Sequence, residues 1–262
     1  MMDPIQRAQL FRSLHVKGHP VVLYNIWDAG GANALVEAGA RAIATGSWSM
    51  AAAHGYDDGE AIPLERVVWI VERISATVDA PLSVDCEGGY AVEPEQVAAN
   101  VRRIIAAGAI GINLEDRVVS GHGLYAVQAQ AERIEAVRQV ARDDGVDLFI
   151  NARTDLFLGS DTSTHPARVG EAIERAAAYK DAGADGFFVP GLMDYGVMRT
   201  IVEATSLQVN VMMMGDLTSI SRIAETGVAR VSYGPGPYLS AMSDLKERFG
   251  AVTQQHPVGL QG

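Results

Sequence analysis

The segment QVAANVRRIIAAGAIGINLED, residues 96–116, holds a complete helix-to-strand unit. Its apolar residues first recur at intervals of three and four, which predicts an amphipathic helix over Gln96–Ala107. That helix ends at Ala107-Gly108-Ala109, because glycine readily adopts the left-handed conformation that terminates a helix. The apolar run Gly111–Glu115 follows directly and predicts a buried strand. A unit of this kind is typical of α/β proteins with a parallel sheet.

The same helix ending recurs just before three other strand-like runs, at Ala38-Gly39-Ala40, Ala182-Gly183-Ala184 and Thr226-Gly227-Val228. Strands are predicted at Val21–Tyr24, Ala42–Ala44, Leu82–Asp85, Gly111–Glu115, Leu148–Arg153, Gly186–Val189, Gln208–Met212 and Arg230–Ser232. Helical patterns between them cover Leu64–Thr77, Gln96–Ala107, Ala126–Asp144, Ala167–Ala182 and Ile220–Thr226. Eight strands alternating with helices predict a closed (β/α)₈ TIM-type barrel. An open doubly wound sheet also fits the alternation, but no GxGxxG motif opens a helix after the first strand.

Length and composition are typical of one domain. The chain has 262 residues, 48% of them hydrophobic, and no low-complexity tract separates two halves. This is enough to bury one barrel-sized core. We therefore predict a single domain over residues 1–262, with an N-terminal helical cap at 1–18 and a C-terminal tail at 250–262.

Charge and cysteine content exclude several classes of protein. The chain has 21 Lys and Arg residues and 32 Asp and Glu residues, so its net charge is 21 − 32 = −11. A negative charge of this size disfavours binding to nucleic acid or to an anionic membrane surface. The single cysteine, Cys86, excludes an internal disulfide framework and a cysteine-based zinc site. No run of 18 apolar residues occurs, and the amphipathic N-terminus is unlike a signal peptide. We expect a cytoplasmic protein.

Polar residues gather at the ends of three predicted strands, in residues 83–90, 111–117 and 149–155. The two-residue period of a strand places the following pairs on common faces: Asp85 with Glu87, Asn113 with Glu115, and Asn151 with Arg153. If these faces point inward, three carboxylates and one arginine meet at the end of the barrel where catalytic residues lie. Cys86 then points the other way, toward the helices, as a buried and inert thiol.

Carboxylates this close repel one another unless a positive charge neutralises them. A divalent cation is the simplest solution, and oxygen ligands favour Mg²⁺ or Mn²⁺. The alternative is that each acid only caps a loop or lies on the surface. The recurrence of acids at consecutive strand ends favours the metal.

Five motifs follow one another along the chain: Asp58 in GYDDGE, Asp85-Cys86-Glu87-Gly88-Gly89-Tyr90, Gly111-Ile112-Asn113-Leu114-Glu115-Asp116, Asn151-Ala152-Arg153-Thr154-Asp155 and Ala182-Gly183-Ala184-Asp185. Their order and spacing resemble those of the isocitrate lyase/phosphoenolpyruvate mutase superfamily, over a region from about Leu10 to Tyr238. The resemblance implies a barrel that binds Mg²⁺ and a small 2-oxo or 2-hydroxy carboxylate. Members break or form a C–C or C–P bond beside the carbonyl through an enolate-like intermediate.

The resemblance also implies roles for single residues. Asp85 is expected to bind the metal directly, while Asp58, Glu87 and Glu115 hold metal-bound waters. Arg153 is expected to clamp the substrate's carboxylate or phosphonate. The expected substrate-binding residues are Ser47, Trp48 and Ser49 after the second strand, Asn210 in the seventh, and, by position, Trp27, Asn113 and Arg153. Trp48 and Ser49 depart from the small, glycine-containing pattern common in that segment.

The loop after the fourth strand departs from the family's signatures. Residues 117–125 read RVVSGHGLY, without the lyase motif that contains a cysteine and without the lysine and Asn-Ser of the mutases. Gly121 and Gly123 could make this loop a mobile lid, with His122 or Tyr125 supplying a proton. The catalytic candidates are therefore Asp58, His122 and Arg153, although a histidine between two glycines can equally be a solvated surface residue.

These observations predict a Mg²⁺-dependent lyase or hydrolase that cleaves a C–C bond in, or decarboxylates, a small 2-oxo or 2-hydroxy carboxylate. Two alternatives remain open: C–P bond chemistry on a phosphonopyruvate-like compound, and a barrel that binds a metabolite without catalysis. The expected partners are a small anionic substrate and further copies of the chain. Because barrels of this family pair by exchanging the last helix, residues 238–249 predict a homo-oligomer, a dimer or tetramer, with little chain left after that helix.

Overall fold

A computed structural model describes residues 2–255 of the chain. Eight parallel strands form one sheet in the order β1-β8-β7-β6-β5-β4-β3-β2. The strands are β1 (Val21–Leu23), β2 (Ile43–Ala44), β3 (Leu82–Asp85), β4 (Gly111–Glu115), β5 (Phe149–Arg153), β6 (Gly186–Phe188), β7 (Gln208–Met212) and β8 (Arg230–Ser232). A parallel bridge between Ile26 and Thr45, just beyond β1 and β2, closes the ring. The predicted (β/α)₈ barrel is confirmed.

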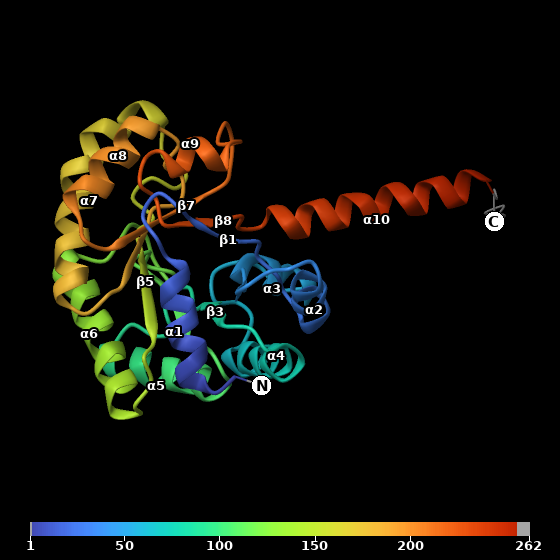
Figure 1. The fold of residues 1–262 in the computed structure, drawn as a ribbon, viewed down its shortest axis with the longest axis horizontal. Coiled ribbons are helices and arrows are strands. Elements are labelled where there is room, and N and C mark those ends of the chain that lie inside the picture. Colours follow the sequence, from blue (N-terminus) through green and yellow to red (C-terminus); the bar gives the residue numbers. More distant parts are fainter. Residues whose placement is uncertain (1, 256–262) are drawn as a thin grey trace.

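Helices follow the strands and surround the barrel (Figure 1). They are α1 (Pro4–Leu14), α2 (Ala29–Glu37), α3 (Ser47–Ala53), α4 (Leu64–Thr77), α5 (Pro94–Ala106), α6 (Val127–Asp143), α7 (His165–Asp181), α8 (Tyr195–Ala204), α9 (Ile220–Ala224) and α10 (Gly236–Gln255), with a 3₁₀ turn at Thr162–Thr164. The predicted strands agree with these bounds to within one residue, and the five predicted helices to within two. No helical range is predicted from the sequence for α2, α8 or the short α3, although the sequence marks the end of α2 at Ala38-Gly39-Ala40.

The main core lies between the strands and the helical layer. Buried aliphatic side chains of α4 and α5, such as Val71 and Val101, pack against outward-facing strand residues such as Val84 and Ile112. Cys86 is fully buried in this layer, as predicted from strand parity. Gly108 follows the C-cap of α5 and has φ +111°, and a Cβ there would meet the Ser75 side chain, so glycine is required for both reasons.

The N-terminal end of the barrel is covered by α1. Asp3 caps this helix through a reciprocal bond with Gln6. Phe11 of α1 and His15, just after it, pack on Phe149 at the start of β5, and the imidazole stacks on that ring at 4.3 Å between centroids. The opposite end of the barrel is therefore the one open to a ligand.

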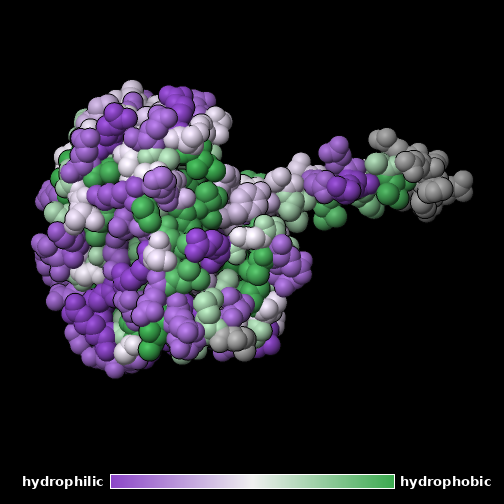
Figure 2. All heavy atoms as spheres, viewed as in Figure 1, coloured by the Kyte–Doolittle hydropathy of each residue, from purple (hydrophilic) through white to green (hydrophobic). Residues whose placement is uncertain are grey.

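The last helix, α10, extends away from the barrel as a single long element (Figure 1). Figure 2 shows apolar side chains along it, and Leu239, Leu245, Phe249 and Val252 are all more than half exposed. The sequence predicted a tail from residue 250, but α10 continues through Gly250 to Gln255. A single glycine inside a helix costs only about 1 kcal/mol relative to alanine, and no proline follows before residue 255. The remainder of the predicted tail, 256–262, lies outside the described residues. Within residues 2–255, no helix is both long and apolar enough to cross a membrane.

Candidate active site

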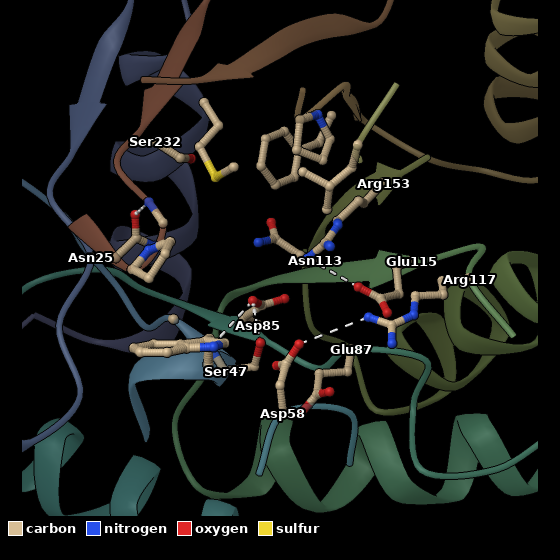
Figure 3. Close-up of a pocket in the computed structure, with 18 of the residues that line it drawn as sticks. Asn25, Ser47, Asp58, Asp85, Glu87, Asn113, Glu115, Arg117, Arg153 and Ser232 are labelled. Atoms are coloured by element: carbon tan, nitrogen blue, oxygen red, sulfur yellow. Dashed lines mark hydrogen bonds and ion pairs between the residues drawn. The ribbon is translucent and has the colours of Figure 1, made fainter. Parts of the chain in front are cut away.

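A pocket of about 270 Å³ opens at the carboxyl ends of the strands. Figure 3 shows four carboxylates on one side of it, those of Asp58, Asp85, Glu87 and Glu115. Asp85 and Glu115 are the last residues of β3 and β4, Glu87 lies just beyond β3, and Asp58 comes from the loop that precedes α4. The convergence predicted from strand parity is therefore present.

Asp85 has one hydrogen-bonded oxygen and one free oxygen. Its Oδ2 accepts hydrogen bonds from the Ser47 hydroxyl at 2.9 Å and from the Ser47 backbone N–H at 3.3 Å. Its Oδ1 is buried and has no partner among the described residues. Ser47 begins α3, so the start of that helix orients the Asp85 carboxylate toward the pocket.

Glu87 reaches the same side of the pocket by a different route from the one that the sequence predicted. The strand ends at Asp85, and Glu87 has φ +48°, so strand alternation does not set its direction. Its Oε2 accepts a hydrogen bond from the backbone N–H of Glu60 at 2.7 Å, while Oε1 is buried and has no partner within residues 2–255. Burial, followed by the nearby Asp85 carboxylate, raises the pKa of Glu87 to about 7.

Arg153 is paired on both sides with acids. Its Nε and Nη2 donate to the two oxygens of Asp155 at 2.6 and 2.9 Å, and Nη1 lies 3.0 Å from Oε2 of Glu115. Burial raises the pKa of Glu115, and the Arg153 guanidinium opposes that rise. A guanidinium has five donors, so Arg153 keeps N–H groups on Nη1 and Nη2 for a ligand.

The sequence analysis did not assign Asp155 to the site. It lies two residues beyond Arg153, in phase with Asn151, and that spacing was the available signal. Its backbone N–H donates to Asp116 at 3.0 Å. Asp116 also accepts from Arg175 and Tyr179 of α7, so buried side chains behind the barrel hold the partner of Arg153 in place.

Arg117 is a second cation that the sequence analysis did not assign. It lines the pocket, and its Nη1 lies 3.8 Å from Oδ2 of Asp58, with both side chains about two-fifths exposed. The pair joins the loop before α4 to the loop after β4 across the pocket edge (Figure 3). An exposed pair of this kind contributes little to stability.

The other predicted residues divide into two groups. Ser47, Trp48 and Asn113 line the pocket together with Asp58, Asp85, Glu87, Glu115 and Arg153. Ser49, Asn210, Trp27 and His122 are not among the lining residues. Ser49 is buried in α3, and Asn210 is buried and exchanges hydrogen bonds with Ser232, which lines the pocket. Trp27 packs against Tyr238, and His122 is exposed on its loop. Tyr125 lines a neighbouring cavity and faces Arg133.

Asn25 completes the polar rim and was missed because it lies in a short loop after β1. Its Oδ1 accepts the backbone N–H groups of Tyr233 and Gly234, both at 2.9 Å, and its Nδ2 donates to Thr45. Asn25 therefore ties the loop after β8 to the loop after β2.

The wall formed by the later strands is apolar. In the sheet order β7 lies four strands from β3, which places it across the barrel from Asp85. This wall contains Leu158, Phe188, Pro190, Met212, Met214 and Pro235. The pocket thus combines an acidic side with an uncharged side.

The acids fit a divalent cation that has few direct protein ligands. In the part of the chain that the structure describes, no three His, Cys, Asp or Glu side chains are grouped closely enough to enclose a metal ion. The free, buried oxygens of Asp85 and Glu87 are nevertheless costly without a partner. One direct ligand and several water-mediated ones, as Mg²⁺ prefers, would satisfy both observations.

These features define a (β/α)₈ barrel with an acidic, metal-compatible pocket at the carboxyl ends of its strands. The chain belongs to the isocitrate lyase/phosphoenolpyruvate mutase superfamily: the family model for phosphoenolpyruvate phosphomutase matches residues 11–253. The resemblance noted from the motifs is confirmed.

Three proteins show how far the similarity extends. A solved structure from Burkholderia cenocepacia J2315, provisionally named a phosphonomutase, is 46% identical, has a TM-score of 0.91, and covers 97% of this chain and 99% of its own. The 2-methylisocitrate lyase of Escherichia coli K12 is 28% identical over 210 residues, 77% of this chain and 68% of the lyase. A phosphonopyruvate hydrolase solved with oxalate and Mg²⁺ shares the fold, with 21% identity, a TM-score of 0.82 and coverage of 95% and 87%.

Superfamily members are enzymes, namely lyases, mutases and hydrolases that act on small carboxylates and use Mg²⁺. The residues of this pocket are compatible with such chemistry.

Proposed function

We propose that this protein is a Mg²⁺-dependent lyase that cleaves a C–C bond in a small 2-oxo or 2-hydroxy carboxylate through an enolate-like intermediate, with decarboxylation of a 2-oxo acid as the favoured reaction. The proposal depends chiefly on one observation: Asp85 and Glu87 each keep a buried, unpartnered oxygen within a pocket that also contains Arg153. Such an arrangement suits a cation and a carboxylate held side by side.

Asp85 would hold the metal directly, and Glu87, Glu115 and Asp58 would hold its waters. Bound Mg²⁺ polarises a carbonyl and stabilises the negative charge that develops when the neighbouring bond breaks. Arg153 binds the substrate's 1-carboxylate with its remaining N–H groups, while Asp155 keeps the guanidinium plane in one orientation.

Decarboxylation is favoured because it needs no protein acid at the bond-breaking step. The bond between C3 and the second carboxylate breaks, its electron pair forms the C2=C3 bond of an enolate, and the former 2-oxo oxygen takes the negative charge. The carboxylate departs as neutral CO₂, and C3 later takes a proton from solvent. The loop 117–125 supplies neither cysteine nor lysine, and His122 is exposed outside the pocket. The apolar wall opposite Asp85 favours neutral CO₂ over a charged carboxylate.

A substrate panel tests the proposal. Oxaloacetate, a 2-methylisocitrate-type acid and phosphonopyruvate are incubated with the protein, with and without Mg²⁺, and release of pyruvate, CO₂ and phosphate is followed. We expect Mg²⁺-dependent pyruvate from oxaloacetate. Phosphate release from phosphonopyruvate alone would assign C–P chemistry instead, and binding without turnover of any compound would assign a non-catalytic barrel.

Asp85→Asn tests the metal ligand, with Asp57→Asn as its matched control, because Asp57 is exposed in the same acidic loop as Asp58 but does not line the pocket. We expect Asp85→Asn to lower kcat/KM by about 10³-fold, or about 4 kcal/mol, and the control to stay within about twofold. Full wild-type activity after exhaustive chelation would overturn the metal dependence.

A further inference from the structure

A fully buried arginine, Arg230, lies at the start of β8 inside the barrel. Among residues 2–255 its Nε and Nη1 have no hydrogen-bond partner, and the one opposite charge that acts on it is that of Asp85. Within the described part of the chain, its one hydrogen bond runs from Nη2 to Oδ1 of Asn113, at 3.3 Å. An unpaired buried charge is costly, so a side chain of this kind calls for an explanation beyond packing.

The contact determines which way the Asn113 amide points. Arginine can only donate, so the Asn113 atom that faces it must be the carbonyl oxygen. In this orientation the Asn113 Oδ1 also accepts a hydrogen bond from Nδ2 of Asn151 on β5, at 2.9 Å. A flipped Asn113 amide would place its NH₂ group against the Arg230 guanidinium, which has no acceptor.

Because Arg230 and Asn151 both bind Oδ1 of Asn113, its Nδ2 group remains available to a ligand in the pocket. Asn113 is in register with Asp85 on β3, and both line the cavity. Figure 3 shows Asn113 between Asp85 and the Arg153–Glu115 pair. Burial lowers the pKa of Arg230 to about 9, partly offset by Asp85, so the guanidinium stays protonated at neutral pH and always acts as a donor.

We propose that Arg230 is a positioning residue that, together with Asn151, holds the Asn113 amide so that its NH₂ group donates to an oxygen of the bound carboxylate. This inference rests on the proposed function, because it requires the pocket to bind a small carboxylate. Arg230 itself does not line the pocket and acts through Asn113.

A double-mutant cycle on ligand affinity tests this role. The probe is oxalate in saturating Mg²⁺, measured by calorimetry with wild type, Arg230→Met, Asn113→Ala and the double variant. We expect each single change to weaken oxalate binding by about tenfold, the loss of one hydrogen bond to a charged ligand. In the Asn113→Ala background, Arg230→Met should weaken it by less than about twofold, because the group it positions is gone.

The matched control is Arg138→Met, which removes another buried arginine that bonds to Gly183, Leu148 and Asp185 away from the pocket. We expect it to lower the Tm and to leave oxalate affinity unchanged. Asn151→Ala removes the second donor to the Asn113 oxygen, and it serves as the test if Arg230→Met does not fold. It should weaken oxalate binding in the wild-type background only.

The outcomes separate this inference from the proposed function. If wild type does not bind oxalate with Mg²⁺, the proposed carboxylate site itself is wrong. If wild type binds and the Arg230 and Asn113 effects multiply, or Arg138→Met weakens binding equally, the positioning role is overturned while the proposed function stands.

Discussion

His15 is expected to make the stability of the barrel sensitive to acid. The imidazole is buried at the N-terminal end, between Phe11 and Phe149, with Nδ1 2.8 Å from the Phe11 carbonyl and Nε2 without a partner. Burial, followed by the positive charge of Arg230, lowers the pKa of His15 from 6.5 to about 3.

The direction of the effect follows from the lowered pKa. Between pH 6.5 and 3 the unfolded chain protonates this histidine and the folded protein does not, so the free energy of unfolding falls as the pH falls through that window. At pH 5 the loss is about 2 kcal/mol relative to the plateau above pH 6.5. This loss of stability depends little on the pKa of His15 in the folded protein, because His15 is already neutral there at pH 5.

Glu87 works in the opposite direction, because its pKa is raised to about 7 and its folded form binds the proton more readily. Wild type alone therefore does not isolate His15, and a variant is needed. His15→Phe keeps an aromatic ring against Phe149 and removes the titration.

The assay is urea unfolding followed by circular dichroism, at pH 7 and pH 5, for wild type and His15→Phe. The difference in unfolding free energy between the two proteins should shift by about 2 kcal/mol in favour of the variant on going to pH 5. A shift below about 0.5 kcal/mol would refute the reasoning, because it would mean that His15 is protonated in the folded state.

Three further predictions concern the site and the assembly. Arg153→Lys keeps a positive charge beside Glu115 but loses the two-bond contact with Asp155, so kcat/KM on the substrate found by the panel should fall by about 10²-fold or more; activity within about threefold of wild type would make Arg153 a scaffold residue. His122→Asn should change kcat/KM by less than about threefold across the pH–rate profile, because His122 is exposed outside the pocket. A larger fall in kcat/KM would show that the loop closes over the substrate and brings His122 into the site. Leu245→Glu with Phe249→Glu should convert a homo-oligomer to monomer in light scattering at micromolar concentration, since both side chains are exposed four residues apart on α10; a monomeric wild type would contradict this.

The sequence by itself determined the barrel and the place of its chemistry. Helix and strand periods are local properties, and glycines such as Gly108 mark where one gives way to the other. Parallel strands bring their carboxyl ends to one side, so Asp85 and Glu115 had to meet once the strands were recognised. The motif order around them was enough to identify the superfamily.

Tertiary structure alone decided how those side chains pair. The period of a strand says that Arg153 points inward, but only the packed barrel shows that Asp155 occupies one edge of its guanidinium. Arg230 is a second example. In the sequence it is one residue of a predicted strand, but in the packed barrel it is fully buried and donates a hydrogen bond to Asn113. Neighbours along the chain determine which face of a strand a side chain occupies. Its contact partners depend instead on distances across the barrel, between strands that are far apart in sequence, and no local pattern encodes those distances.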